Sequence, residues 1–373
     1  MGRNTQRRRP RIVVTVTVDS TLSFTQSLVP RLVECGWEVH LVTTPGPNLE
    51  AYQGREGVYI HPLPMHRAPH PNDILSLGNW LRLLRRVQPD VIYAASPKAS
   101  MLSMVAGRIV GVPVRVYAIL GLRLETATGT LLEVLKRTEK LTTQSATHVL
   151  SVSKSISEAL PKYGINVPTH IIGNGSLWGI DLTRFTETER EFNPQAPVVG
   201  FVGRLDRDKG ISELVAAFSQ ILEEIPQAHL LLGGPDEGMA HLLQTLPAGS
   251  YTWLGRVEDP REVHHHCDVF CLPTYREGFG MVVTEAQACG VPVVGTDATG
   301  VIDAVDYGRA GRVAKAKDAQ SLYRELMVVL TDPDERQRLR EAGLLWSKHF
   351  DRVELTRKTE EWLRQLLIDS QRQ

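Results

Sequence analysis

Two cations follow an apolar run in the second half of the chain, within Val202-Gly203-Arg204-Leu205-Asp206-Arg207-Asp208-Lys209-Gly210. This pattern is typical of a strand end that opens onto a helix. Gly203 permits close approach to the backbone, while Arg204 offers a planar fork of donors and Lys209 a compact point charge. Such a pair suits a diphosphate that departs with negative charge. The cations could equally form a helix-capping cluster with the intervening aspartates, so the motif alone supports both interpretations.

Two glutamates bracket a second loop, in which Glu277-Gly278-Phe279-Gly280 leads to a helix that begins near Met281 and carries Glu285 in its first turns. A helix N-terminus offers free N–H groups and the positive end of a dipole, which together form an anion site. Carboxylates accept hydrogen bonds from sugar and ribose hydroxyls. The pattern therefore predicts a ligand with anionic and polyhydroxyl parts. Glu285 could instead only complement the helix dipole.

A third strand ends in a glycine turn at Tyr251-Thr252-Trp253-Leu254-Gly255-Arg256-Val257. This turn could present backbone groups to a nucleobase. Alone the pattern is weak, because most such turns only connect a strand to the next helix.

Alternating apolar strands and helical segments must position these motifs. In the first half, strands are predicted at residues 12–18, 38–42, 90–95, 113–119 and 147–153, with helices at 24–34, 74–87, 98–110 and 130–145. The alternation restarts after Pro197, with strands at 198–202, 228–232, 251–254, 268–272 and 292–295. Continuous apolar runs between helices indicate parallel sheets covered on both faces. The expected fold class is α/β, with two facing Rossmann-like, doubly wound domains.

The domain division is predicted from the glycine-rich stretch 172–179, which lacks periodicity. We expect an N-terminal Rossmann-like domain at residues 1–178 and a C-terminal one at 179–350. The amphipathic helix within 351–373 is expected to pack back onto the first domain. Ligands of doubly wound sheets bind beyond the carboxyl ends of the strands, so the active site is predicted in the interdomain cleft.

Length, charge and cysteines limit the function classes. The 373 residues exceed the roughly 250–300 that one core supports. The formal net charge of zero gives no general attraction to nucleic acid. No stretch approaches the ~20 apolar residues of a membrane-spanning helix, and all four cysteines are expected to be reduced and buried, which favours a cytoplasmic protein. Five arginines lie near the start of the chain: Arg3, Arg7, Arg8, Arg9 and Arg11. They could form a solvated tail or contact anionic lipid, and the second interpretation would place the protein at the inner face of the cell membrane.

Taken together, these motifs resemble the family 4 retaining glycosyltransferases of GT-B architecture. The resemblance covers the whole second half, including Gly233-Gly234 and the 288–294 stretch; the first half matches in layout more than in motif. A closer likeness, to bacterial enzymes that extend undecaprenyl-diphosphate-linked sugars, rests on Ala94-Ala95-Ser96-Pro97-Lys98, Leu120-Gly121-Leu122 and Gly295-Thr296-Asp297-Ala298-Thr299-Gly300.

The resemblance implies that the N-terminal domain, 1–178, binds the acceptor and the C-terminal domain, 179–350, binds the nucleotide-sugar. It also implies roles for the residues on the donor side. Arg204 and Lys209 would neutralise the departing diphosphate, and Glu277 would contact the transferred sugar. These three form the predicted catalytic set, without a metal ion or a protein nucleophile. The predicted donor-binding set, with Glu285 on the ribose and the 256–257 turn on the base, is Gly203, Gly233, Arg256, Val257, Gly278, Phe279, Gly280, Met281, Val282 and Glu285.

On the acceptor side the chain departs from the family pattern. Many members carry two glycines after the first strand, whereas Asp19-Ser20-Thr21-Leu22-Ser23-Phe24 stands here. Side-chain hydroxyls in this stretch could replace the glycine N–H groups. Basic residues in nearby loops could bind a diphosphate on the acceptor, or they could equally be solvated surface charges. The predicted acceptor-binding set is Ser20, Thr21, Arg67, Lys98, Gly121 and Arg123.

The resemblance implies transfer of a hexose or N-acetylhexosamine from a UDP-sugar to a polyprenyl-diphosphate-linked saccharide in surface-glycan or protein-glycan assembly. A soluble natural-product acceptor, or a GT-B sugar-nucleotide epimerase, is the alternative. A nicotinamide dehydrogenase would need Gly-x-Gly-x-x-Gly after a first strand, which neither Val18-Asp19-Ser20 nor Val202-Gly203-Arg204 supplies. A non-catalytic scaffold or sugar-nucleotide-binding protein would not need the four charged residues of the motifs, which are Arg204, Lys209, Glu277 and Glu285. His264-His265-His266 could suggest a metal, but consecutive helical residues point in different directions.

Overall fold

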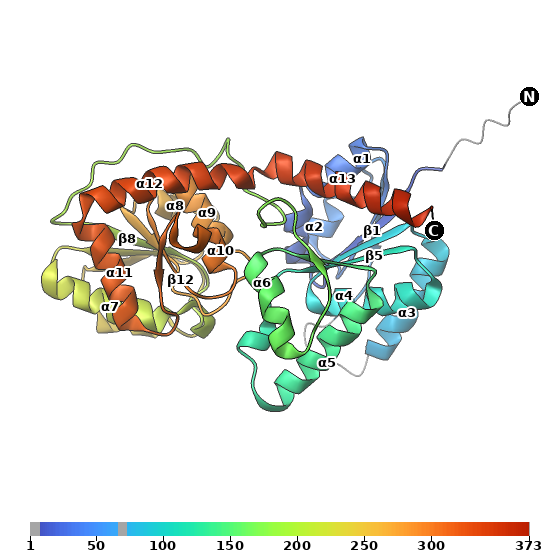
Figure 1. Cartoon of the computed structure of the whole chain (residues 1–373), viewed down its shortest axis with the longest axis horizontal. Helices are drawn as coiled ribbons and strands as arrows, with labels where there is room; N and C mark the ends of the chain where they lie inside the picture. Colours follow the sequence, from blue (N-terminus) through green and yellow to red (C-terminus); the bar gives the residue numbers. More distant parts are fainter. Residues whose placement is uncertain (1–7, 66–72, 373) are drawn as a thin grey trace, which may run out of the picture.

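The computed structural model describes residues 8–65 and 73–372, which form two lobes (Figure 1). In these residues the first half forms a seven-stranded sheet of order β3-β2-β1-β4-β5-β6-β7 and the second a six-stranded sheet of order β10-β9-β8-β11-β12-β13. Every strand pair is parallel. The prediction of two doubly wound α/β domains is therefore confirmed.

The first sheet and its helices follow the predicted alternation. Its strands are β1 (Arg11–Thr15), β2 (Glu38–Thr43), β3 (Val58–Pro62), β4 (Val91–Ala95), β5 (Val114–Ile119), β6 (His148–Ser151) and β7 (Thr169–His170). Its helices are α1 (Leu28–Glu34), α2 (Pro47–Glu50), α3 (Asp73–Val87), α4 (Pro97–Val110), α5 (Gly129–Ser145) and α6 (Lys154–Ala159), with 3-10 turns η1 (Asp19–Thr25), η2 (Arg123–Glu125) and η3 (Leu160–Tyr163).

The second sheet begins after a connecting segment, residues 171–197. Its strands are β8 (Val198–Val202), β9 (His229–Gly233), β10 (Tyr251–Trp253), β11 (Val269–Cys271), β12 (Val293–Thr296) and β13 (Arg312–Ala314). The helices are α7 (Ile211–Glu224), α8 (Arg261–His264), α9 (Met281–Ala288), α10 (Val301–Ala304), α11 (Ala319–Thr331), α12 (Pro333–Ser347) and α13 (Arg352–Ser370), with 3-10 turns η4 (Arg207–Lys209), η5 (Ala240–Thr245), η6 (Asp306–Gly308) and η7 (Lys348–Phe350).

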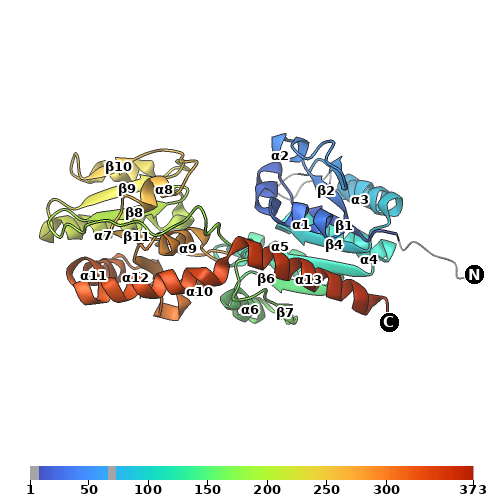
Figure 2. The same cartoon turned by 90° about the horizontal axis from the view of Figure 1, so that it is seen from above.

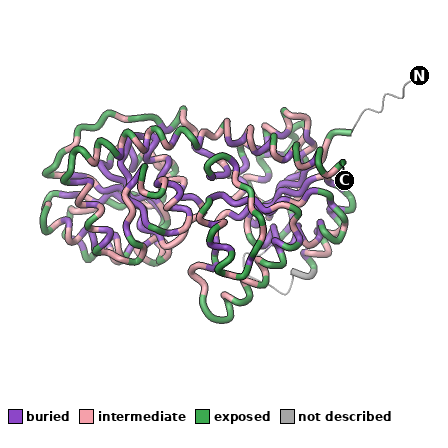
Figure 3. The backbone as a smooth tube through the Cα atoms, viewed as in Figure 1, coloured by how far each residue is buried: buried purple, intermediate pink, exposed green. Residues whose placement is uncertain are grey.

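Burial explains why the central strands are mostly apolar. All five residues of β4 and all four of β12 are buried, as expected for strands with helices on both faces. Figure 3 shows this as two buried centres, one in each lobe.

Strand order fixes where a ligand can bind. The order reverses between β1 and β4 in the first sheet and between β8 and β11 in the second. Crevices form beyond the carboxyl ends of strands at such reversals. In the second sheet the two chain segments that leave this point are 203–209 and 272–280, which carry the predicted donor motifs.

The last helix, α13, crosses from the second lobe and lies along the first, as Figure 2 shows from above. It packs on α1, and the buried indole of Trp37 donates a 2.9 Å hydrogen bond to Glu360. Where the chain crosses back, the Ile180 N–H donates to the Phe350 carbonyl at 2.7 Å and the Arg352 N–H to the Ile180 carbonyl at 2.9 Å. The two segments run parallel at this bridge, which ties α13 to the end of the glycine-rich stretch 172–179, called the hinge below.

The region after β1 differs from the predicted helix at 24–34. The chain forms η1 first, and α1 begins only at Leu28. Asp19 begins η1, and its carboxylate accepts hydrogen bonds from the backbone N–H groups of Asn48 (3.0 Å) and Leu49 (2.7 Å). A residue that satisfies the first N–H groups of α2 in this way holds the preceding loop in place.

None of the helices in residues 8–65 and 73–372 has the length and apolar character needed to cross a membrane.

A partly buried carboxyl on α5 makes stability depend on pH. Tyr117 on β5 donates a 2.6 Å hydrogen bond to Glu139, and burial raises the pKa of Glu139 to about 7 from 4.5. The unfolded chain loses this proton at lower pH than the folded protein does. The folded state therefore binds more protons between pH 4.5 and 7, so this group lowers stability as the pH rises through that range.

Glu139→Gln is expected to raise the melting temperature more at pH 8 than at pH 5.5, because the amide still accepts from Tyr117 and carries no charge. The gain in the free energy of unfolding should be larger at pH 8 than at pH 5.5 by on the order of 2 kcal/mol. Thermal melts of both proteins at the two pH values would measure it. Glu133→Gln, on the exposed face of the same helix, is the control. An equal change at both pH values would contradict the assignment.

Candidate active site

A cavity of about 480 Å³ lies between the two domains. It is lined from the first domain and hinge by Leu120, Val152, Ser176, Leu177 and Trp178, and from the second domain by Val202, Gly203, Arg204, Lys209, Pro260, Glu277, Gly278, Phe279, Gly280, Met281, Val282 and Glu285. The cavity sits where β8 ends, at the reversal of strand order. It brings together all three predicted catalytic residues and most of the predicted donor-binding set.

The ammonium group of Lys209 forms an ion pair with Glu277, from the loop after β11. Both side chains are mostly shielded, with exposed fractions of 17% and 20%. Asp206 caps η4 by accepting from the Lys209 N–H at 3.1 Å. Gly210 follows with φ +68°, and a Cβ there would lie 2.1 Å from the Pro273 carbonyl oxygen. These contacts hold Lys209 in one place on the cavity wall.

Arg204 is more open, with 49% of its side chain exposed. Its guanidinium pairs with Glu237 at 2.5 Å and with Asp206 at 2.9 Å. The helix-capping interpretation of this motif is therefore correct for Asp206, while both cations also line the cavity. A carboxylate-paired arginine that faces a cavity can exchange its partner for a phosphate of similar geometry.

The start of α9 is shaped by glycines that face the first domain. Gly280, with φ +75°, is the residue before the helix. A Cβ on Gly278 would lie 2.1 Å from the Leu120 carbonyl oxygen, and a Cβ on Gly121 would lie 3.6 Å from the Gly278 backbone nitrogen. A Cβ on Gly300 would in turn approach the Gly278 carbonyl at 2.5 Å. Gly278 and Gly121 thus allow the two domains to meet at the cavity rim, while Gly300 allows close packing within the second domain.

The first turns of α9 carry two further contacts. The Ser176 hydroxyl of the hinge donates to the Met281 sulfur at 2.7 Å. Glu285 directs one carboxylate oxygen, Oε2, into the protein, where it has no hydrogen-bond partner. Nε2 of His264 lies 3.9 Å from this oxygen.

The predicted base-binding turn lies outside the cavity wall. Arg256 is exposed and Val257 is half-buried, and neither lines the cavity. A Cβ on Gly233 would lie 2.9 Å from the Val257 side chain, and one on Gly234 would lie 1.8 Å from the Gly203 carbonyl. In this structure the glycine pair thus provides space for protein packing at the ends of β8 and β9.

Comparisons with known proteins agree with this geometry. The family described as "Glycosyl transferases group 1" matches residues 184–346, and the "Glycosyl transferase 4-like domain" matches residues 23–175. The capsular polysaccharide biosynthesis glycosyltransferase CapM of Staphylococcus aureus is 30% identical over 345 residues, which cover 88% of this chain and 90% of CapM. The chain belongs to the group 1 glycosyltransferases.

Two further relatives extend the comparison. The N,N'-diacetylbacillosaminyl-diphospho-undecaprenol alpha-1,3-N-acetylgalactosaminyltransferase of Campylobacter jejuni is 27% identical and covers 72% of this chain and 76% of its own. Among solved structures, sucrose-phosphate synthase of Thermosynechococcus elongatus superposes with a TM-score of 0.79 at 21% identity, over 97% of this chain and 100% of that one. Anabaena HepE, solved with UDP and glucose, superposes with a TM-score of 0.76 at 19% identity, over 96% of this chain and 100% of HepE. The predicted GT-B fold is confirmed.

The acceptor-side predictions fall at the carboxyl edge of the first sheet of this glycosyltransferase. Ser20, exposed, and Thr21, half-buried, lie in η1, and Lys98 is buried in the first turn of α4. Arg123 is exposed in η2. None of these four lines the 480 Å³ cavity; Gly121 meets the Gly278 backbone instead. Arg67 lies outside the described residues.

Sequence reasoning missed the contacts that join the domains beside the cavity. The Asp303 carboxylate, from α10, accepts from the Lys154 N–H at 2.8 Å and the Ser155 N–H at 3.2 Å, at the start of α6. The Ser155 hydroxyl contacts the same carboxylate and accepts from the Gly300 N–H at 2.8 Å. Only the motif at 295–300 signalled this region. Asp303 carried no signal of its own, because its partners lie in the other domain.

Two more interdomain contacts complete this set. Arg276, the residue before Glu277, donates to the Thr126 hydroxyl at 3.0 Å and pairs with Asp208 at 2.7 Å. Thr299 donates to Glu125. The side chains of Asp303, Arg276 and Thr299 thus help to bridge the domains around the cavity.

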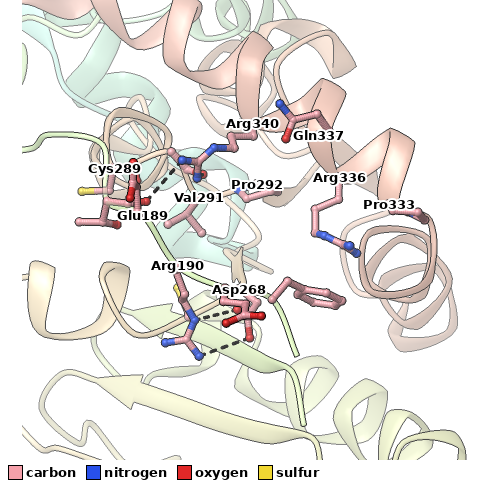
Figure 4. Close-up of a pocket in the computed structure, with 15 residues that line it drawn as sticks. Glu189, Arg190, Asp268, Cys289, Val291, Pro292, Pro333, Arg336, Gln337 and Arg340 are labelled. Atoms are coloured by element: carbon pink, nitrogen blue, oxygen red, sulfur yellow. Dashed lines mark hydrogen bonds and ion pairs between the residues drawn. The ribbon is translucent and has the colours of Figure 1, made fainter. Parts of the chain in front are cut away.

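A second cavity of about 550 Å³ lies at the opposite edge of the second sheet (Figure 4). Asp268 precedes β11 there, and it pairs with Arg190 at 2.7 Å and accepts from the Val198 N–H at 2.7 Å. Arg340 pairs with Glu187 at 2.6 Å. These paired charges attach the segment after the hinge to the sheet. The larger volume does not make this cavity the active site, because it lies at the amino ends of the strands.

The histidine run does not form a metal site. His264 is buried, His265 is half-buried and His266 is exposed. Within the described parts of the chain, no group of three or more histidine, cysteine, aspartate or glutamate side chains could hold a metal ion.

Proposed function

We propose that this glycosyltransferase transfers a hexose or N-acetylhexosamine from a UDP-sugar, with retention of configuration, to a hydroxyl of a polyprenyl-diphosphate-linked saccharide. The observation that carries the proposal is the position of Lys209, Arg204 and the start of α9 on one wall of the interdomain cavity. Two cations and a helix N-terminus there suit a nucleotide diphosphate. The Staphylococcus aureus relative, a capsular polysaccharide biosynthesis glycosyltransferase, and the Campylobacter jejuni relative, which acts on a diphospho-undecaprenol-linked sugar, support an acceptor in glycan assembly.

The Lys209–Glu277 pair suggests how binding and chemistry are linked. When the donor enters, its diphosphate takes the ammonium group, and Glu277 becomes free to accept hydrogen bonds from the sugar. The bond between the anomeric carbon and the phosphate oxygen then breaks, and the acceptor oxygen bonds to the same face of that carbon. The acceptor proton passes to the departing phosphate. Lys209 and Arg204 stabilise the charge that develops on UDP, and fixed charges of this kind are effective where water is excluded.

A ligand series tests the donor. We expect UDP and UDP-sugars to raise the melting temperature with or without EDTA. The gain in the free energy of unfolding should follow their dissociation constants and reach about 2.7 kcal/mol at a ligand concentration of 100 times Kd. GDP should act more weakly and NAD not at all. Stabilisation by NAD alone would support a dehydrogenase instead.

The acceptor and the reaction class need a separate assay. Radiolabelled transfer from the best donor to polyprenyl-diphosphate-linked saccharide should exceed transfer to soluble saccharides. Transfer only to a soluble acceptor would favour a natural-product glycosyltransferase. Interconversion of the UDP-sugar without any acceptor would favour the epimerase.

The exposed face of α5 supports a peripheral contact with anionic membrane at the inner face of the cell membrane. Leu131, Val134 and Leu141 are each 46% exposed, and Arg137 and Lys140 are exposed on the same helix. Apolar and basic side chains together suit the interface of anionic lipids. This helix follows the 120–125 turn at the cavity, so the contact would bring a lipid-linked acceptor near the site.

Val134→Glu with Leu141→Glu is expected to lower binding to anionic vesicles about ten-fold, because the substitutions remove apolar area and add negative charge. Leu345→Glu, at a 63% exposed position on α12 of the other domain, is the control. Co-sedimentation with vesicles containing anionic lipid would measure the effect. Equal binding by the parent and the double variant would rule out contact through α5.

A further inference from the structure

His264 lies directly behind Glu285, outside the residues that line the cavity. Its side chain is completely buried, and neither ring nitrogen has a hydrogen-bond partner. The ring packs edge-on against Phe270, with centroids 4.9 Å apart. A buried polar group without a partner costs about 1–3 kcal/mol, so packing alone would favour an apolar residue here.

Glu285 also has a buried polar atom without a hydrogen-bond partner. Its Oε2 atom is buried and unpartnered, 3.9 Å from Nε2 of His264. The residue nevertheless lines the cavity, and 16% of its side chain is exposed. One carboxylate oxygen therefore faces the histidine and the other is accessible. An imidazole N–H and a carboxylate oxygen are a donor and an acceptor, yet they lie about 1 Å beyond hydrogen-bond distance.

The cavity contacts both elements that set this distance. His264 ends the short helix α8, and the residue immediately before that helix, Pro260, lines the cavity together with Glu285. A ligand that fills the cavity thus touches α8 at Pro260 and α9 at Glu285. A relative movement of about 1 Å between the two would complete the hydrogen bond.

We propose that His264 is a positioning residue for donor binding. Its Nε2–H donates to Oε2 of Glu285 when the nucleotide is bound, which orients the other carboxylate oxygen toward the ribose hydroxyls. The inference rests on the proposed function, because it takes a nucleotide as the ligand of Glu285. It adds a buried residue, acting through Glu285, to the determinants of donor affinity.

Binding of UDP and of 2′,3′-dideoxy-UDP, measured by titration calorimetry, separates positioning from packing. His264→Phe keeps an aromatic ring beside Phe270 and removes the donor. It should weaken UDP binding about ten-fold and leave binding of the dideoxy nucleotide within about two-fold, because that ligand lacks the hydroxyls that Glu285 would bind. His265→Phe, at the adjacent position outside the cavity, should change neither.

Two further variants make the result independent of folding defects. His264→Gln places an amide N–H near Nε2 and should restore part of the UDP affinity. In a Glu285→Gln background, His264→Phe should add little further loss. Equal losses for both nucleotides, or unchanged UDP affinity in His264→Phe, would overturn the inference alone. Failure of the parent protein to bind UDP would overturn the proposed function, and the inference with it.

Discussion

Lys209→Ala is expected to lower kcat by about 10²–10³-fold while the protein stays folded, because it removes a fixed cation from the departing diphosphate. The substitution also leaves the Glu277 carboxylate unpaired beside the phosphates, where it would repel them. Steady-state kinetics with saturating donor and acceptor would measure the change. Lys348→Ala, at an exposed lysine in η7, is the control.

The double variant Lys209→Ala with Glu277→Gln tests the exchange of partners. If the two side chains act as a pair, its loss should be smaller than the product of the two single losses. Near-normal turnover of Lys209→Ala in an intact fold would remove Lys209 from the catalytic set.

Gly278→Ala is expected to reduce kcat/KM by about 10²-fold or more, because the added Cβ would lie 2.1 Å from the Leu120 carbonyl oxygen of the other domain. Misplacement of the domains by about 1 Å is enough for such a loss. UDP binding should change less, since the nucleotide motifs lie within the second domain. Kinetics and UDP titration of the same variant would show the difference.

Gly78→Ala is the matched control, because a Cβ at Gly78 in α3 would meet nothing within 4 Å. That variant should be as active as the parent. A Gly278→Ala protein with full transfer activity would show that the domain contact at Leu120 is not needed for catalysis.

The sequence predicted the sheets and the donor wall because both depend on local patterns. Apolar runs such as residues 198–202 and 268–272 have the length of buried strands. The rule that ligands bind at the carboxyl ends of strands then placed Lys209 and Glu277 near each other. Their ion pair follows from the adjacency of β8 and β11, which the sequence pattern did not specify.

Contacts between domains could not be predicted in this way. Asp303 and Ser155 are far apart in the chain and carry no motif, so only the placement of two complete domains brings them together. Gly278 was predicted to bind the donor, and its φ is not in the left-handed region. The structure adds a steric role at the domain contact, for which the sequence gives no signal.

Short, exposed or irregular elements were also missed. Strand β3 has no buried residue, so it lacks the apolar pattern from which strands are recognised. The first two residues of the predicted helix, 24 and 25, belong instead to η1, whose first residue, Asp19, bonds to α2 more than twenty residues away. The sequence does not distinguish His264 from the two histidines that follow it. The role proposed for His264 rests on its burial behind Glu285, which only the structure gives.

The central claim is most directly tested by following the reaction of a UDP-sugar and a polyprenyl-diphosphate-linked saccharide by proton NMR, in buffer that contains EDTA. The proposal predicts UDP and one new glycosidic linkage with the anomeric configuration of the donor. A product of inverted configuration, or a donor consumed only after divalent metal is added, would contradict it.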